Sequence, residues 1–184
     1  MSVLDKVIAA VTPPESQEAR DAARAKATQA SANCEWLRLV LAHHRAVEDA
    51  FARVAAAGDA NGRRQAQRWL ITLLTGHSLA EEAVLYPAMA LTDQKAHSTA
   101  AYTEQSGTKV NLAALETLDP MSQDYLDKLE HVRGAVAHHV YEEEDKWFVE
   151  LSREGDAAMQ SRLSARYAEE FNRYMGPDAA MPAA

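Results

Sequence analysis

The chain has 184 residues, of which 47% are hydrophobic and 25% are charged, as expected for one globular domain with a substantial core. Its formal net charge of -8 opposes binding to nucleic acid or to an anionic membrane, because both are negatively charged. We therefore expect no nucleic acid or membrane partner, and we look for a metal cation, a small ligand or another protein.

The sequence shows no sign of secretion or of membrane insertion. The single cysteine, Cys34, cannot form a disulfide within the chain. No stretch approaches the roughly 18 apolar residues that a membrane span requires. The N-terminal sequence MSVLDKVIAAV carries Asp5, where a signal peptide would be apolar. We expect a soluble, cytoplasmic protein.

Helix-forming residues dominate the chain, and only seven glycines and six prolines interrupt it, so we expect an all-α fold. Turn-forming residues divide the sequence into long helical segments. The central region, residues 32–152, is expected to form an antiparallel, up-and-down four-helix bundle. Its four struts are residues 32–57, 63–91, 94–118 and 121–152.

Before the bundle, residues 1–31 are expected to form an N-terminal helical arm. The stretch ESQEARDAARAKATQA, which begins at residue 15, is polar on nearly every face. Such a segment forms either a solvent-facing helix or a partly ordered arm, and the sequence leaves both open.

Ionisable residues share the apolar stripes of three struts. On the first strut, His44 lies among apolar residues that recur at helical spacing. On the second, His77 and Glu81 are four residues apart and therefore lie on one side of the helix. On the fourth, His139 and Glu143 repeat that spacing. A helix normally keeps its core stripe free of such groups, so three helices direct histidine or carboxylate inward.

The second and fourth struts carry the same motif, H-x-x-x-E-E. GHSLAEEAVLYPAM, from residue 76, aligns with HHVYEEEDKWFVEL, from residue 138. A histidine and a glutamate four residues apart can bind one cation, and two such helices facing each other form a cage. Imidazole and carboxylate donors without cysteine favour iron or manganese over a structural zinc. One copy arises often by chance, but burying three imidazoles and two carboxylates without a cation would leave uncompensated polar groups.

With an inward histidine on the first strut and an aromatic residue closing each motif, residues 35–152 resemble the hemerythrin-like HHE cation-binding family. The resemblance implies a four-helix bundle around non-heme iron, usually two ions, bridged by carboxylates and by an oxo or hydroxo group. It also implies the metal ligands, which are His44, His77, Glu81, His139 and Glu143.

The third strut departs from the family pattern, which has a histidine where this chain has Gln105, with Lys109 one turn further on. Neither residue is a good iron ligand, and Lys109 would repel the cation unless a carboxylate such as Glu104 paired with it. We expect a site that lacks ligands on this side. Tyr86, Glu104 or Tyr102 would fill the gap, or one ion would be lost.

Four residues beside the expected ligands have two alternative roles. His43 and His138 each precede a ligand histidine and are turned about 100° from it, so they lie either beside the site or at the surface. Glu82 and Glu144 each follow a ligand glutamate. They either accept hydrogen bonds from ligand imidazoles or are exposed acids.

After the bundle, residues 153–176 are expected to form a C-terminal helix with one apolar stripe, formed by Leu163, Tyr167, Phe171 and Met175. This stripe would pack on the bundle or on a second chain, which would give a homodimer. The small-residue tail, 177–184, is expected to be flexible.

The sequence supports three functions and does not decide whether the protein is an enzyme. The first is binding or sensing of dioxygen, nitric oxide or iron itself. The second is an iron-dependent oxidoreductase acting on peroxide or dioxygen, in which Lys109 or Tyr86 supplies protons. The third is a metal-free helical scaffold, against which the inward ligands argue.

Overall fold

The computed structural model describes residues 15–176, and all regular secondary structure among them is helical, which confirms the expected all-α fold. The N-terminal 14 residues and the tail expected to be flexible, 177–184, lie outside the described residues. In chain order the elements are α2 (Gln17–Ala30), η1 (Ser31–Asn33), α3 (Glu35–Ala56), α4 (Ala60–Ala80), η2 (Glu81–Leu85), α5 (Tyr86–Ala90), α6 (Lys95–Glu116), α7 (Gln123–Glu142), η3 (Glu143–Trp147), α8 (Phe148–Leu151) and α9 (Ala157–Met175).

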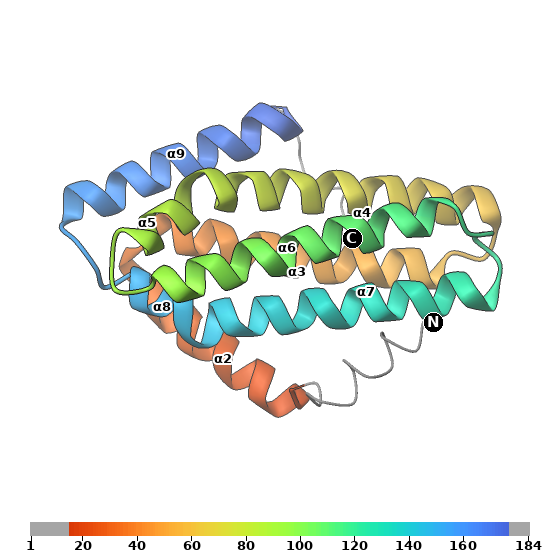
Figure 1. Ribbon diagram of the computed structural model, residues 1–184, viewed down its shortest axis with the longest axis horizontal. Helices are drawn as coiled ribbons and strands as arrows, with labels where there is room; N and C mark the ends of the chain where they lie inside the picture. Colours follow the sequence, from red (N-terminus) through yellow and green to blue (C-terminus); the bar gives the residue numbers. More distant parts are fainter. Residues whose placement is uncertain (1–14, 177–184) are drawn as a thin grey trace.

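The long helices α3, α4, α6 and α7 lie side by side along the long axis of the molecule and form a helical bundle (Figure 1). α9 packs outside α3 and α4, and α2 packs against α3, α7 and η3. Within residues 15–176, no helix combines the length and apolar character that crossing a membrane requires.

The bundle helices begin where the sequence carries turn-forming residues. Asp59 before α4, Ser122 before α7 and Asp156 before α9 each accept a hydrogen bond from the backbone N–H three residues further on. Such N-caps satisfy donors that the first helical turn leaves free. The helix limits therefore agree with the expected struts to within a few residues.

Two π-helical segments interrupt the bundle, and each begins at a glutamate of the repeated motif. η2 begins at Glu81, and the N–H of Tyr86 donates to the carbonyl of Glu81, five residues back. η3 begins at Glu143, and the N–H of Phe148 donates to the carbonyl of Glu143. Single π turns inside α-helices occur frequently at functional sites.

The core consists of two apolar clusters with a polar layer between them. On α3, Leu41 belongs to one cluster and Val47 to the other, and the buried His44 lies between them. The bundle therefore buries a layer of ionisable groups in the middle of its apolar core.

The two outer helices, α2 and α9, pack apolar residues against the bundle of the same chain. Of the two alternatives for α9, its stripe packs on the bundle, where Leu163 and Tyr167 are buried. Pairing of two chains through α9 stays a prediction. Residues 17–30 of the expected arm form the regular helix α2, and Ala23 and Ala27 are buried against the bundle.

Candidate metal centre

Five ionisable side chains meet in the polar layer, and we call them the cage. α3 supplies one of them, and each copy of the repeated motif supplies a histidine and a glutamate. All are buried. The cage consists of His44, His77, Glu81, His139 and Glu143, the residues that the motifs indicated.

The first donor set consists of one atom each from His44, His77, Glu81 and Glu143, and these atoms all lie within 4.8 Å of one another. His44 Nε2 is 3.3 Å from Glu143 Oε2, and His77 Nε2 is 3.3 Å from Glu81 Oε1. His44 Nε2, Glu81 Oε1 and Glu143 Oε2 have no hydrogen-bond partner although they are buried. Buried polar atoms are rarely left without partners, so this convergence fits a bound cation.

The second donor set surrounds the hydroxyl of Tyr86. The hydroxyl oxygen lies 3.0 Å from His139 Nε2, 3.0 Å from Glu143 Oε1 and 3.2 Å from Glu81 Oε2. Each glutamate therefore presents one oxygen to each donor set. Glu81 and Glu143 connect the two halves of the cage.

Gln105 on α6 occupies the side on which we expected a missing ligand. Its Nε2 donates to Glu81 Oε2 at 2.7 Å and to the Tyr86 oxygen at 2.6 Å. An amide nitrogen is a donor and offers no lone pair to a metal. Gln105 thus holds Tyr86 and Glu81 in place through its nitrogen, and its buried amide oxygen has no hydrogen-bond partner among the described residues.

Carboxylates fix the rings of His44 and His139 from outside the cage. His44 Nδ1 lies 2.8 Å from Glu144 Oε1, and His139 Nδ1 lies 2.7 Å from Glu104 Oε2. An ionised carboxylate only accepts hydrogen bonds, so we assign the donor N–H to Nδ1 of each ring. This assignment directs each Nε2 into the cage, as in metal-binding histidines.

A tyrosine holds the third ring. The hydroxyl of Tyr167, on α9, lies 3.2 Å from His77 Nδ1 and 2.9 Å from His43 Nδ1. His43 thus stands beside the site, one of its two expected locations, where it meets Tyr167 and the edge of the His77 ring. The sequence assigned Tyr167 to helix packing, and the only signal of another role was a hydroxyl on an apolar stripe.

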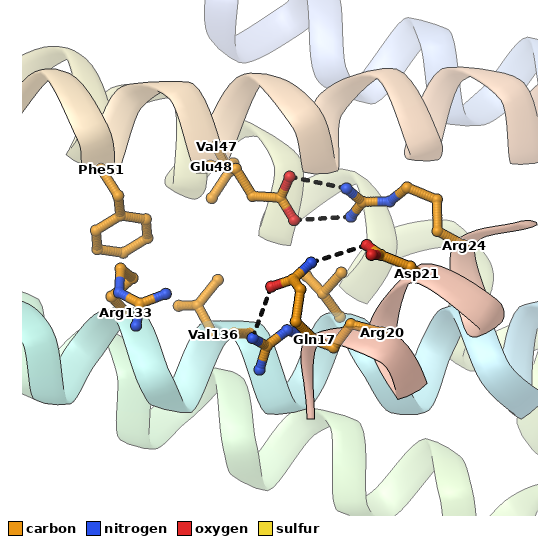
Figure 2. A pocket seen from close by; sticks show the side chains of 11 residues that line it. Gln17, Arg20, Asp21, Arg24, Val47, Glu48, Phe51, Arg133 and Val136 are labelled. Carbon is orange, nitrogen blue, oxygen red and sulfur yellow. Dashed lines mark hydrogen bonds and ion pairs between the residues drawn. The ribbon is translucent and has the colours of Figure 1, made fainter. Parts of the chain in front are cut away.

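The arm reaches the site through Arg24, which the sequence did not identify. Its guanidinium donates to both carboxylate oxygens of Glu48 at 2.8 Å (Figure 2). It also donates to Glu144 at 3.0 Å. Arg24 also lines a surface cavity of about 250 Å³ between α2, α3 and α7. Because Glu144 binds His44, α2 is linked to the cage by two consecutive hydrogen bonds.

Several residues near the motifs in sequence lie away from the cage. Lys109 pairs with Glu82 at 2.5 Å, and both are partly exposed, so the carboxylate that balances Lys109 is Glu82 and not Glu104. Tyr102 donates to the backbone oxygen of Glu82 at 2.6 Å and does not enter the site. His138 is half-exposed and pairs with Glu15, which places it at the surface.

Electrostatics favours protonated imidazoles when no cation balances the glutamates. Burial lowers the pKa of His139, but the charge of Glu143 and the hydrogen bond to Glu104 outweigh it and raise this pKa to about 10. Burial also opposes ionisation of His44, yet the adjacent Glu143 carboxylate and the hydrogen bond to Glu144 raise its pKa well above the usual value. Both rings would have to lose a proton before binding a metal ion.

Three other buried groups are shifted toward their neutral forms, whereas the neighbouring His139 and His44 outweigh burial and hold the pKa of Glu143 well below its usual value. Burial and the neighbouring charge of Glu143 raise the pKa of Glu81 to about 7. Burial and the charge on His44 lower the pKa of His77. Burial and the same two glutamates raise the pKa of Tyr86. A cation would lower the pKa of Glu81 and that of Tyr86, since it attracts the carboxylate and the phenol oxygen, and it would lower the pKa of His77 further, since it repels an imidazolium.

The family model of the hemerythrin HHE cation-binding domain matches residues 37–151, which include every cage residue. The chain belongs to this family. The resemblance read from the motifs is confirmed, and this hemerythrin-family chain also matches a protein described as a DNA nickase from Nostoc sp.. They are 30% identical over 98 residues, which are 53% of this chain and 26% of the nickase, so the chain spans about a quarter of that relative. No solved structure gives a significant match.

Proposed function

We propose that this hemerythrin-family chain binds non-heme iron in its cage, within an up-and-down four-helix bundle, to bind or sense dioxygen, nitric oxide or iron itself. The supporting observation is the group of unpartnered buried atoms, His44 Nε2, Glu81 Oε1 and Glu143 Oε2. Each such atom costs about 1–3 kcal/mol when it lacks a partner. A bound cation would remove that cost.

The residues of the cage fit iron chemically. Imidazole nitrogens and carboxylate oxygens suit iron or manganese, and no thiolate accompanies them among the described residues of the site. The residues that hold each Nδ1 orient the rings, so the protein has little to rearrange on binding. Iron would supply reversible binding of a diatomic molecule or of peroxide at coordination positions that the protein leaves open.

An iron-dependent oxidoreductase acting on peroxide or dioxygen is the second candidate. The observation that favours it is the Tyr86 hydroxyl, which lies 3.0 Å from both His139 Nε2 and Glu143 Oε1 and can transfer a proton within the cage. Lys109 cannot serve this purpose, because it lies at the surface with Glu82. A metal-free scaffold is disfavoured by the unpartnered atoms.

DNA cleavage is not part of the proposal. The match to the Nostoc nickase covers 26% of that protein. The net charge of -8 would repel a phosphate backbone. We propose that the chain acts without a nucleic acid or membrane partner and in the cytoplasm.

Metal analysis tests the proposal directly. Protein produced with iron available should contain at least about one iron per chain, and replacing His77→Ala and His139→Ala together should remove it, since each motif loses its imidazole. His138→Ala is the matched control, because this histidine adjoins a cage residue but pairs with Glu15 at the surface. Less than about a tenth of an iron per chain in the unaltered protein would contradict iron binding.

Peroxide distinguishes the two candidate functions in the iron-loaded protein. Consumption of about one peroxide per site, followed by no further reaction, supports binding or sensing. Sustained consumption over many equivalents supports the oxidoreductase and contradicts a purely sensing role.

A further inference from the structure

The second donor set is the half of the cage to which α6 contributes no histidine. It contains one nitrogen, His139 Nε2, two carboxylate oxygens, from Glu81 and Glu143, and the hydroxyl of the fully buried Tyr86. We infer that these four atoms form a second metal position in which Tyr86 is a ligand through its phenolate oxygen. The inference rests on the proposed iron binding and specifies the chemistry of the second ion.

The separations of these atoms agree with ligation of one ion. Donors bonded to a first-row metal at about 2.0–2.2 Å lie roughly 3 Å apart when they are neighbours. The Tyr86 oxygen is 3.0, 3.0 and 3.2 Å from the other three donors, and His139 Nε2 is 3.2 Å from Glu143 Oε1. The hydroxyl thus already lies among the donors at the spacing of a ligand.

The phenol proton of Tyr86 cannot serve both carboxylate oxygens beside it, although Glu81 Oε2 also accepts an N–H from Gln105. A phenol has a single proton, which can be donated to only one acceptor at a time. The Tyr86 hydroxyl faces carboxylate oxygens of Glu81 and Glu143, so one of these oxygens has no proton from it. A cation in the second position would serve both oxygens and the phenolate together.

Gln105 is oriented to support a phenolate. Its Nε2 lies 2.6 Å from the Tyr86 oxygen and only donates, so its N–H stabilises a negative oxygen. In the binding step the O–H bond of Tyr86 breaks, its proton leaves to solvent, and an oxygen–metal bond forms without change of oxidation state. Gln105 is therefore a positioning residue for Tyr86.

The other copy of the motif shows that packing does not require the hydroxyl. Phe148 occupies the position that aligns with Tyr86, is equally buried, and stacks on the Tyr86 ring with centroids 6.5 Å apart. Both residues follow a π-helical segment that begins at a cage glutamate. A phenyl ring thus fills an equivalent place, and the oxygen of Tyr86 serves the cage.

Tyr86→Phe tests the inference, with Tyr102→Phe as the matched control. Tyr102 packs on Tyr86 with ring centroids 5.1 Å apart, but its hydroxyl binds a backbone oxygen outside the cage. Iron(III)-loaded protein should show a visible phenolate-to-iron(III) charge-transfer band, and iron content should be about two per chain. Tyr86→Phe should abolish the band and reduce iron to about one per chain, whereas Tyr102→Phe should retain both.

Resonance Raman excitation within that band tests the unaltered protein without any variant. Enhanced tyrosine ring vibrations support ligation, and their absence overturns it. If the unaltered protein and Tyr86→Phe bind the same amount of iron and give the same spectrum, Tyr86 is not a ligand. That result would leave the proposed iron binding itself unaffected. Failure of the unaltered protein to bind iron would instead contradict the proposed function itself.

Discussion

Glu82 and Glu144 occupy the same position in the two copies of the motif, yet they have different neighbours. Glu144 is buried and accepts a hydrogen bond from His44 Nδ1. Glu82 is partly exposed and pairs with Lys109. The difference arises from the neighbouring helices, since α3 brings an imidazole to one glutamate and α6 brings an ammonium to the other. Only one of the two glutamates therefore supports the cage.

Glu144→Gln should weaken metal binding about 10- to 100-fold, the usual effect of losing a carboxylate that orients a ligand imidazole. The amide retains an acceptor oxygen but loses the charge that favours the donor form of His44 Nδ1. Glu82→Gln is the control and should change affinity little, because Glu82 touches no imidazole. Competition with a chelator measures both affinities. Equal losses in the two variants would contradict the role of Glu144.

Spacing within a helix predicted the residues of the cage, but it did not predict what surrounds them. His77 and Glu81 share a helix face whatever the rest of the fold does, because four residues make about one turn. Tyr167 reaches His77 from α9, and Arg24 reaches Glu144, which binds His44, from α2, so the roles of both depend on how separate helices pack. Glu104 was one of several candidates for the α6 side, and packing directs it to His139 Nδ1.

At the scale of elements, the π segments determine which side chains follow the cage glutamates into the core. One extra residue in a turn rotates everything after it by about 100° relative to a regular α-helix. Pro87 has no backbone N–H to donate, which suits the interruption of the helical hydrogen bonds after η2. The aligned position after η3 is Val149, which has a backbone N–H. Proline is therefore not the common cause. The hydrophobic pattern predicted continuous helices at both places, because no residue in the second copy of the motif indicates the π segment η3.

The short helix α2 also depends on a contact that composition does not reveal. Its polar sequence predicted either a solvent-facing helix or a loose arm, but Arg24 binds Glu48 and the buried Glu144. Hydrogen bonds to charged groups contribute about 1.5–3 kcal/mol, more than an exposed ion pair. Arg24 thus docks α2 together with the buried Ala23 and Ala27 and the ion pair between Lys26 and Asp145.

Arg24→Gln should loosen α2 from the bundle. Amide hydrogen exchange in residues 17–30 should become faster, and metal affinity should fall a few-fold because Glu144 loses a partner that fixes its position. Arg20→Gln is the control on the same helix, since Arg20 binds only the backbone oxygen of Glu15 and the side chain of Gln17. Unchanged amide exchange in Arg24→Gln would show that the other contacts of α2 alone hold this helix on the bundle.

At the scale of the whole molecule, the stability of the folded protein depends on how the charges of the two cage glutamates are balanced. It separates the two apolar clusters of the core and buries three imidazoles and two carboxylates between them. In the metal-free protein, protons on His44 and His139 offset the glutamates, because both pKa values are raised. A metal ion that binds only the folded state stabilises it by about 2.7 kcal/mol at 100 times its dissociation constant.

Metal loading should therefore release protons, and its pH dependence follows from the same groups. The pKa of His139 is about 10 and that of His44 is above its usual value, so both rings are protonated at pH 7. A metal ion binds the neutral ring, so full loading at pH 7 should release roughly two protons from these rings, besides one from Tyr86 and about half of one from Glu81. Deprotonation of the two rings alone should raise the apparent affinity by up to about 100-fold per pH unit, less steeply as the pH approaches the pKa of His139. Below pH 7, protonation of Glu81, whose pKa is about 7, should weaken binding further.

Proton counting with a pH indicator in weakly buffered, anaerobic solution measures this release for each iron(II) added. Glu104→Gln removes the charge beside His139 Nδ1, which helps to raise the pKa of that ring. The variant should release fewer protons at pH 8 than the unaltered protein, because more of its His139 is already neutral. Lys109→Gln, which alters a surface pair on the same helix, should leave the count unchanged. Loading without proton release in the unaltered protein would mean that the imidazoles are already neutral and the glutamates already ionised in the metal-free cage, which would contradict the raised pKa values of His44 and His139.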